Sequence, residues 1–117
     1  MKSLHPSLIH SWHAHVYFGA SDRDAAWVLR DTVGTELSGH VTIGRFNEGP
    51  VGPHPMGSYE LAFSPASFAE VVSWLTLNHG SLDVLVHPNT DHELRDHRDC
   101  ALWLGQSHTL ELVGLAP

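Results

Sequence analysis

The sequence is poor in cysteine and in basic residues, and each scarcity excludes a class of protein. Cys100 is the single cysteine among 117 residues, so no internal disulfide can form, which is typical of a reducing compartment. Six basic residues stand against 13 acidic ones, and the net charge of -7 disfavours a nucleic-acid partner because phosphate binding requires a basic surface. No apolar run approaches the length of a membrane span, and no charged leader precedes one. We therefore expect a cytoplasmic protein that binds neither membrane nor nucleic acid.

Histidine, by contrast, is unusually abundant. The 11 histidines outnumber lysine and arginine together, and they are dispersed along the chain. The length and the 42% of hydrophobic residues predict one folded domain, 1–117, with a single core and no room for a separate cofactor domain. Because histidine is the commonest metal ligand and general acid or base, the excess predicts a chemical site on this domain.

Alternation and turn residues predict an α+β fold. Strands are expected at 10–18, 40–46, 56–63 and 82–87, helices from an N-cap at Ser21 to Gly34 and from an N-cap at Ser64 to Gly80, and a C-terminal hairpin from 101–104 and 109–113. The order βαββαβ is that of the ferredoxin-like split unit, an antiparallel sheet with two helices on one face and its first and third strands central. The opposite face is left for a partner subunit, the C-terminal segment or a ligand.

The first strand carries the most informative pattern. Its alternation places His13, His15 and Tyr17 on one face, and apolar Trp12, Ala14, Val16 and Phe18 on the other. The apolar face should meet the helices, so the two imidazoles should share the open face of a central strand. A rigid strand can then direct both toward one metal ion or one substrate.

The same alternation brings further groups to that face. The predicted site contains His13, His15, Glu60 and His87, with His54 supplied by the proline-rich loop 47–55 and Tyr17 nearby. Two histidines and a carboxylate on one side of a metal, with open positions opposite, is the arrangement of non-haem Fe(II) oxygenases. Glu60 could be a ligand or equally well a partner of a ligand or a base, or it could simply be a solvated or ion-paired strand residue. A closed structural zinc site is disfavoured by the single cysteine.

Other histidines have ordinary explanations. His5, His10, His79 and His108 are best interpreted as surface or core-edge residues. The charged run 94–99 is usually a solvated face, but its Arg95, Arg98 and His97 could equally bind a substrate carboxylate.

Three segments together resemble the DOPA 4,5-dioxygenase family. They are His-Ala-His-Val-Tyr-Phe at 13–18; Gly-Pro-His-Pro at 52–55 leading to Tyr-Glu at 59–60; and His-Pro-Asn-Thr at 87–90, followed by Leu-Arg-Asp-His-Arg-Asp at 94–99 and Leu-Trp-Leu-Gly at 102–105. The similarity extends from about residue 10 to about residue 105. A single His-x-His pair is a weak signal, whereas these segments in this order are specific.

The resemblance implies extradiol cleavage of a catechol such as DOPA, with Fe(II) and O2, on a ferredoxin-like domain that forms a homodimer. It implies His15, His54 and His87, with Glu60, as the metal site, zinc being an ion that the purified protein could also carry. His13, His97 and Tyr17 are then the catalytic candidates, and Arg95 and Arg98 the substrate-binding ones. Relatives often have histidine where this chain has Cys100 and a bulky residue where it has Gly57. Both differences argue against assuming that DOPA itself is the substrate.

Two other classes of function remain open from the residues. The same histidines could serve a zinc-binding protein or a different metalloenzyme. Alternatively, the open sheet face could be a protein-interaction surface on which the histidines are incidental.

Overall fold

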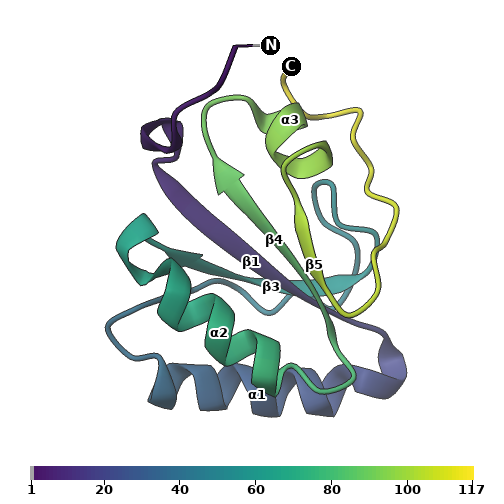
Figure 1. The fold of residues 1–117 in the computed structure, drawn as a ribbon. Coiled ribbons are helices and arrows are strands. Elements are labelled where there is room, and N and C mark those ends of the chain that lie inside the picture. Colours follow the sequence, from purple (N-terminus) through teal and green to yellow (C-terminus); the bar gives the residue numbers. More distant parts are fainter. Residues whose placement is uncertain (1) are drawn as a thin grey trace.

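The fold is a five-stranded antiparallel sheet with helices packed on it, seen in a computed structural model that describes residues 2–117 (Figure 1). The elements are β1 (Ser11–Phe18), α1 (Arg23–Glu36), β2 (Thr42–Ile43), β3 (Gly57–Phe63), α2 (Phe68–Asn78), β4 (Asp83–Asn89), α3 (Glu93–Arg98) and β5 (Leu102–Leu104), with short 3-10 turns at Pro6–Leu8, Ala20–Asp22 and Pro65–Ser67. The strand order is β2-β3-β1-β4-β5. The α+β class is therefore confirmed, and the expected strand at 101–104 joins the sheet as β5.

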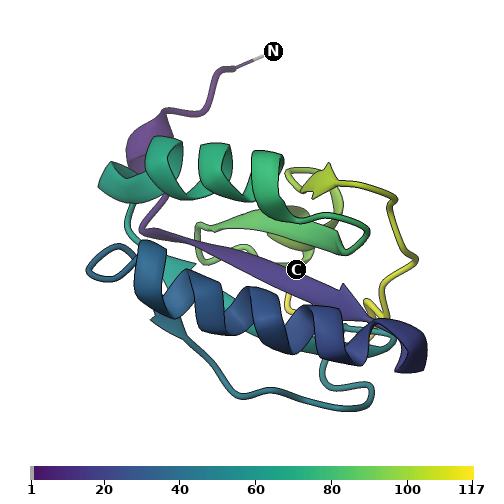
Figure 2. The ribbon, with the colours of Figure 1, turned by 90° about the horizontal axis from the view of Figure 1, so that it is seen from below.

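Helices α1 and α2 lie side by side across the same face of the sheet (Figure 2). Their buried apolar side chains meet those of the three central strands in one core. From the helices this core takes Ala26, Leu29, Val33, Val71 and Leu75, and from the strands it takes Ala14, Val16, Phe18, Tyr59, Leu61, Phe63, Val84 and Val86. None of the helices of residues 2–117 combines the length and the apolar character needed to cross a membrane.

Strand β1 shows the predicted alternation. Ala14, Val16 and Phe18 are buried in the core under the helices, with Trp12 packed against it. His15 pairs with Glu60 of β3 on one side, and His13 pairs with His87 of β4 on the other. Because directly paired residues of neighbouring strands point to the same face, these four polar side chains share the face that the two long helices leave open.

The expected bounds of two strands were wrong. The segment 40–46 forms only the two residues of β2, at the edge of the sheet where a single neighbour supports it, and Arg45 lies beyond its end. Strand β4 runs on through Pro88 and Asn89, beyond the expected end at residue 87. Pro88 is tolerated there because it pairs only with Trp12 of β1, while β5 pairs with β4 no further than Val86.

The helix limits also differ from the prediction. Ser21 lies in a 3-10 turn and α1 begins at Arg23. The helix continues through Gly34, where an added Cβ would lie 3.6 Å from Ile43 Cδ1 of β2, and ends at Glu36. Likewise, Ser64 and Pro65 begin a 3-10 turn, and α2 proper starts at Phe68.

The predicted C-terminal hairpin is wrong. Its first half, β5, pairs with β4, but 109–113 forms no strand. The segment from 105 to 117, called here the C-terminal segment, instead passes over the open face, where the Glu111 N–H donates to the Pro53 carbonyl at 2.9 Å. The charged run expected to be a solvated stretch contains α3, whose Asp96 carboxylate accepts both the N–H and the hydroxyl of Thr90.

Gly57 is explained by packing against β1. An added Cβ would lie 2.7 Å from Phe18 Cε2, closer than such atoms approach. The residue lines a cavity with Arg23 and Glu48, apart from the histidines. A glycine here therefore fits the close approach of two strands and does not widen the cavity that contains His15.

Candidate metal centre

Three histidines from the two central strands β1 and β4 meet on the open face of the sheet. His13, His15 and His87 each offer one ring nitrogen, and these atoms all lie within 4.8 Å of one another. Within residues 2–117 they form the one group of side chains found with the spacing of a metal site. His15 and His87 are 5% and 1% exposed, so water competes little for their nitrogens.

The ring of His87 is fixed by its own backbone neighbour. Its Nδ1 lies 2.9 Å from the carbonyl oxygen of Pro88, which only accepts, so Nδ1 carries the proton and Nε2 has a free lone pair. That Nε2 faces His15 Nε2 at 3.0 Å, so His15 donates in the metal-free protein. A backbone carbonyl on the second nitrogen is the usual support of a metal-binding histidine.

Glu60 supports His13 from β3. Its Oε1 lies 3.2 Å from His13 Nδ1, and the two side chains are 41% and 27% exposed. A proton on Nδ1 satisfies this contact and leaves Nε2 of His13 unprotonated. Glu60, expected at the metal site, thus lies at the cluster's edge and outside the group of three.

His54 comes from the proline-rich loop and lies against the cluster without belonging to the group of three. Its ring centroid is 4.1 Å from that of His15. Its Nδ1 is 2.6 Å from the hydroxyl of Tyr17, the third residue of the polar face of β1. Both side chains are buried, at 8% and 2% exposure.

His97 reaches the cluster from α3, the helix that the sequence did not predict. Its ring centroid lies 3.9 Å from that of His87. Its Nδ1 is 2.7 Å from the Glu93 carbonyl oxygen one turn earlier, so the proton is on Nδ1 and Nε2 is an acceptor. The short helix therefore gives one more imidazole a defined orientation beside the cluster.

Burial keeps the imidazoles of His13, His15, His54 and His87 neutral at neutral pH. It lowers the pKa of His87 to about 3, against some support for the charged form from the Pro88 carbonyl, and it lowers the pKa of His54 to about 4. Burial, together with His54 and His87, holds the pKa of His15 well below its usual range. The pKa of His13 is lowered by burial and partly restored by Glu60. Neutral imidazoles have the lone pairs that metal binding requires.

Two cavities flank the cluster. One, of about 300 Å³, contains His15, His54 and Glu60 together with Arg45. The other, of about 160 Å³, is lined by His97, Arg98, Trp103 and His108 and by two leucines of the C-terminal segment. The largest cavity, of about 530 Å³, lies between α1 and α2 and contains none of the clustered histidines.

The two arginines expected to bind substrate are separated. Arg98 lines the smaller flanking cavity, where it makes two hydrogen bonds to Asp99. Arg95 donates to the Thr90 hydroxyl and lines a different cavity, with Trp12 and Cys100. The structure thus places Arg95 and Cys100 away from the clustered histidines.

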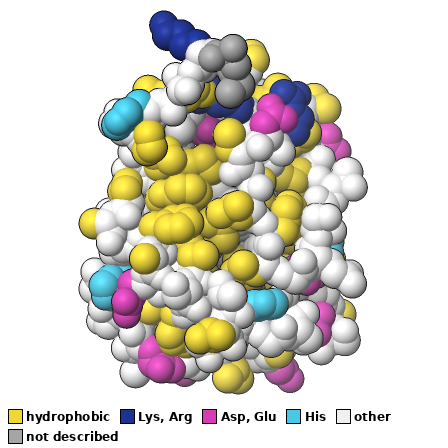
Figure 3. Space-filling view, in the orientation of Figure 1, with side chains coloured by type: hydrophobic (Ala, Val, Ile, Leu, Met, Phe, Trp, Pro, Cys, Tyr) yellow, Lys and Arg dark blue, Asp and Glu magenta, His cyan; other side chains and the backbone are white. Residues whose placement is uncertain are grey.

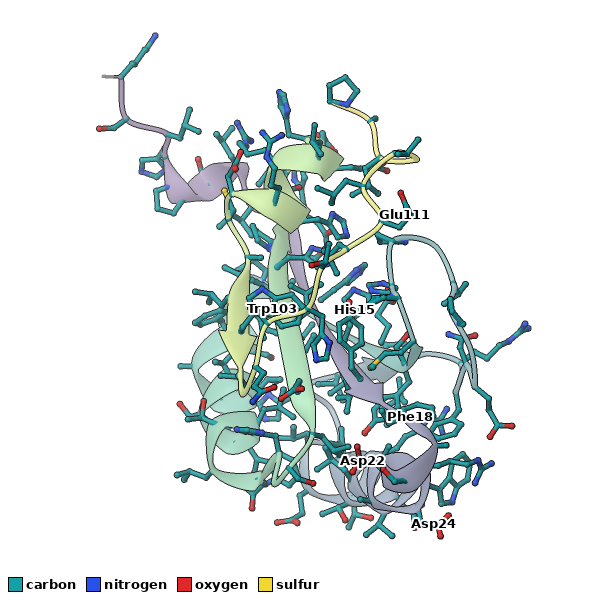
Figure 4. All side chains as sticks on the ribbon, turned by 90° about the vertical axis from the view of Figure 1, so that its right-hand side faces the viewer. His15, Phe18, Asp22, Asp24, Trp103 and Glu111 are labelled. Carbon is teal, nitrogen blue, oxygen red and sulfur yellow. The ribbon has the colours of Figure 1, made fainter. Side chains whose placement is uncertain are left out.

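The C-terminal segment and the proline-rich loop enclose the open face. Figure 4 shows His15 and Trp103 on the side of the sheet over which the C-terminal segment passes, and Glu111 where that segment meets the loop. The histidines are therefore reached from a cleft rather than from a flat surface.

Sequence reasoning missed three neighbours of the site. His108, interpreted as a surface residue, lies with its ring centroid 5.5 Å from that of Tyr17 and its Nε2 2.8 Å from Asp83 Oδ2. Trp103 is 5.8 Å from Tyr17, centroid to centroid, and Arg45 lines the larger flanking cavity. The alternation of β5 could have indicated Trp103, whereas the other two lie in irregular segments.

Comparison with known proteins agrees with the family suggested by the sequence. Residues 12–113 match the model of the Dopa 4,5-dioxygenase family. A DOPA 4,5-dioxygenase from Amanita muscaria is 41% identical over 98% of this chain, and an uncharacterised 21.2 kDa protein from Botryotinia fuckeliana is 34% identical over 87% of it. The alignments cover 54% and 61% of those proteins, so the chain spans little more than half the length of the curated relatives that it matches.

A solved structure is similar over nearly the whole fold. A proposed dioxygenase from Nostoc punctiforme superposes with a TM-score of 0.90 at 43% identity, and the match covers 94% of each chain. With the family model matched over most of the sequence and two-fifths identity to a curated relative, the chain belongs to the Dopa 4,5-dioxygenase family.

Proposed function

We propose that this protein is a non-haem Fe(II) dioxygenase that cleaves the ring of a catechol. The observation that carries the proposal is the cluster of His13, His15 and His87 on the open sheet face of a Dopa 4,5-dioxygenase family member. The proposal keeps the ferredoxin-like arrangement as the framework, with β1 and β3 between β2 and β4.

The three histidines fit a metal ion. An imidazole nitrogen binds zinc at about 2.1 Å, so two nitrogens that bind one ion lie no more than about 4.2 Å apart. The Nε2 atoms of His15 and His87 are 3.0 Å apart. The three would hold the ion, and Glu60 would support His13 from outside. Imidazole ligands suit iron, zinc, copper and nickel alike, so the choice of Fe(II) comes from the dioxygenase relatives.

When bound, Fe(II) would lower the pKa of the catechol hydroxyls and hold catechol and O2 together. The protein's own groups do the rest. His97 Nε2, an acceptor beside His87, can take a catechol proton. Trp103 and His108 line the smaller flanking cavity and offer aromatic rings against which a substrate ring can pack. The C-terminal segment and the loop around Pro53 limit the access of water.

The proposed substrate is a small aromatic diol with a carboxylate on its side chain. The larger flanking cavity, of about 300 Å³, is at the lower limit of small-ligand sites, about 300–1,000 Å³. Arg98 in the smaller cavity is the proposed carboxylate partner, and it would have to exchange Asp99 for the substrate. Arg95 is a weaker candidate because it lies in a separate cavity.

Anaerobic reconstitution with Fe(II), followed by air and a panel of catechols, tests the proposal. DOPA, caffeate and protocatechuate are offered in parallel, and a yellow ring-fission product is expected from at least one. His87→Gln should abolish both iron binding and turnover, while His40→Gln, at an exposed histidine bonded to Ser67, should change neither. Stoichiometric iron binding without turnover of any catechol would refute ring cleavage.

A zinc-binding protein is the second candidate, because three neutral imidazoles serve zinc equally well. Zinc in the purified protein and no catechol turnover after exchange for Fe(II) would favour it. A non-catalytic interaction domain would instead retain its metal content when His15 and His87 are both replaced.

The homodimer and the cytoplasmic location also remain proposals. The C-terminal segment, one of the three occupants expected on the open face, covers part of it. Hydrophobic side chains gather instead on the face seen in Figure 3. Exposed Leu4 and Leu8 also line a cavity with Trp12. An apolar surface of this kind is compatible with self-association.

A further inference from the structure

We infer that His54 is a hydrogen-bond donor to the bound substrate and not a metal ligand, and that Tyr17 fixes it in that state. The inference rests on the proposed function and deepens it by assigning a role to His54, the histidine that the proline-rich loop brings to the cluster. It follows from counting the hydrogen bonds of two buried side chains.

The hydroxyl of Tyr17 needs an acceptor. Tyr17 is 2% exposed, and a phenol, whose ordinary pKa is about 10, keeps its proton near neutral pH. Among residues 2–117 the partner found for this hydroxyl is His54 Nδ1, at 2.6 Å. If Nδ1 were protonated and donated to the phenol oxygen, the buried hydroxyl proton would have no partner, at a cost of about 1–3 kcal/mol. Tyr17 therefore donates and Nδ1 accepts.

The tautomer of His54 follows. A neutral imidazole has one N–H, and with Nδ1 accepting, that proton must be on Nε2. Because Nδ1 accepts, the ring cannot carry a second proton, and His54 is neutral in this arrangement. A ligand that bound through Nε2 would need its lone pair on that same atom. Tyr17 thus opposes the metal-binding role expected for His54, and the residue also lies outside the group of three.

The protonated nitrogen faces the substrate cavity. His54 and His15 both line the cavity of about 300 Å³ on one side of the cluster. Within the described chain, Nε2 of His54 has no hydrogen-bond partner, yet it is not among the fully buried polar atoms left unpaired. Nε2 is therefore accessible, and because the residue lines this cavity, its N–H can donate to an oxygen of a molecule bound there.

His97 provides a hydrogen-bond acceptor on the other side of the cluster. Its Nδ1–H donates to the Glu93 carbonyl, so its Nε2 accepts. The cluster is thus flanked by a donor from the proline-rich loop and an acceptor from α3. A diol that gives a proton to one side and accepts a hydrogen bond from the other would be oriented between them.

Nitrogen NMR of the metal-free protein tests the tautomer directly. Long-range proton–nitrogen correlations at pH 7.5, assigned through each ring's own backbone, should show His54 protonated on Nε2 and both His87 and His97 protonated on Nδ1. Tyr17→Phe should shift the His54 ring nitrogens and leave those of His97 in place. A His54 ring protonated on Nδ1 in the wild-type protein would overturn the inference.

Zinc titration provides the second measurement. Wild-type protein and the variants His54→Gln and Tyr17→Phe should bind one Zn(II) per chain, whereas His87→Gln should bind none. With Fe(II), His54→Ala should lower kcat by about 10²-fold while metal content stays unchanged. Loss of zinc from His54→Gln equal to that from His87→Gln would refute the inference. Absence of catechol turnover in the wild type would refute the proposed function alone and leave the tautomer result standing.

Discussion

Replacing Glu60 by glutamine should weaken metal binding without abolishing it. Glu60 Oε1 lies 3.2 Å from His13 Nδ1, so the carboxylate stabilises the ring from behind. Loss of such a supporting group typically lowers metal affinity by about 10–100-fold. Both side chains are partly exposed, at 41% and 27%, so water screens the charge and the lower end applies. We expect a decrease of about tenfold in zinc affinity, which is about 1.4 kcal/mol.

The measurement is competition for Zn(II) against a chromophoric chelator at pH 7.5. Glu70→Gln is the matched control, because this exposed glutamate lies on α2, among the helices on the opposite face of the sheet, and should leave the affinity unchanged. Wild-type affinity in Glu60→Gln would mean that the carboxylate gives His13 no support. A loss as complete as that of His87→Gln would mean that Glu60 binds the metal itself, and the reasoning from the group of three would then be wrong.

Three further outcomes can be checked. Burial lowers the pKa values of His54 and His87 to about 4 and about 3, whereas unfolded histidine titrates near 6.5, so the unfolded state binds more protons between these values. The free energy of unfolding of the metal-free protein should therefore fall as pH decreases below about 6.5. The decrease should reach up to about 1.4 kcal/mol per pH unit for each histidine. Urea midpoints that stay constant from pH 7 to 5 would contradict this. Gly57→Ala forces a Cβ against Phe18 and should destabilise the fold by about 1–3 kcal/mol in urea unfolding, whereas Gly49→Ala, where an added Cβ meets nothing within 4 Å, should be neutral. Arg98→Met should raise KM for carboxylated catechols and leave KM for 4-methylcatechol unchanged, and an equal rise for both would exclude a carboxylate contact.

The sequence predicts the central part of the fold because one face of β1 is apolar and the other is polar. Its apolar residues identify the face that meets the helices, and this fixes where His13 and His15 point. Glu60 and His87 follow from the same alternation on the neighbouring strands. The C-terminal half is predicted less well, because 109–113 alternates like a strand but leaves the outer edge of β5 unpaired and instead contacts the loop at Pro53.

Helix α3 escapes prediction for a local reason. It has only six residues, and its start is held by the Asp96 carboxylate, which accepts from the N–H and the hydroxyl of Thr90. A short helix of charged residues has no apolar stripe long enough to reveal the helical repeat. Its position nonetheless decides the role of His97, because the Glu93 carbonyl that orients the ring is available only in the helical conformation.

The division of the histidines into ligands, donor and acceptor depends on the second nitrogen of each ring, which no sequence pattern reports. For His87 that nitrogen contacts the carbonyl of the next residue, so the tautomer follows from local backbone. For His54 that nitrogen contacts the hydroxyl of Tyr17 on β1. The two groups meet only because the loop that carries His54 folds over β1. A His-x-His pair on a strand therefore identifies the face where the chemistry occurs. The hydrogen bonds behind the rings determine which imidazole can bind a metal and which must donate a proton.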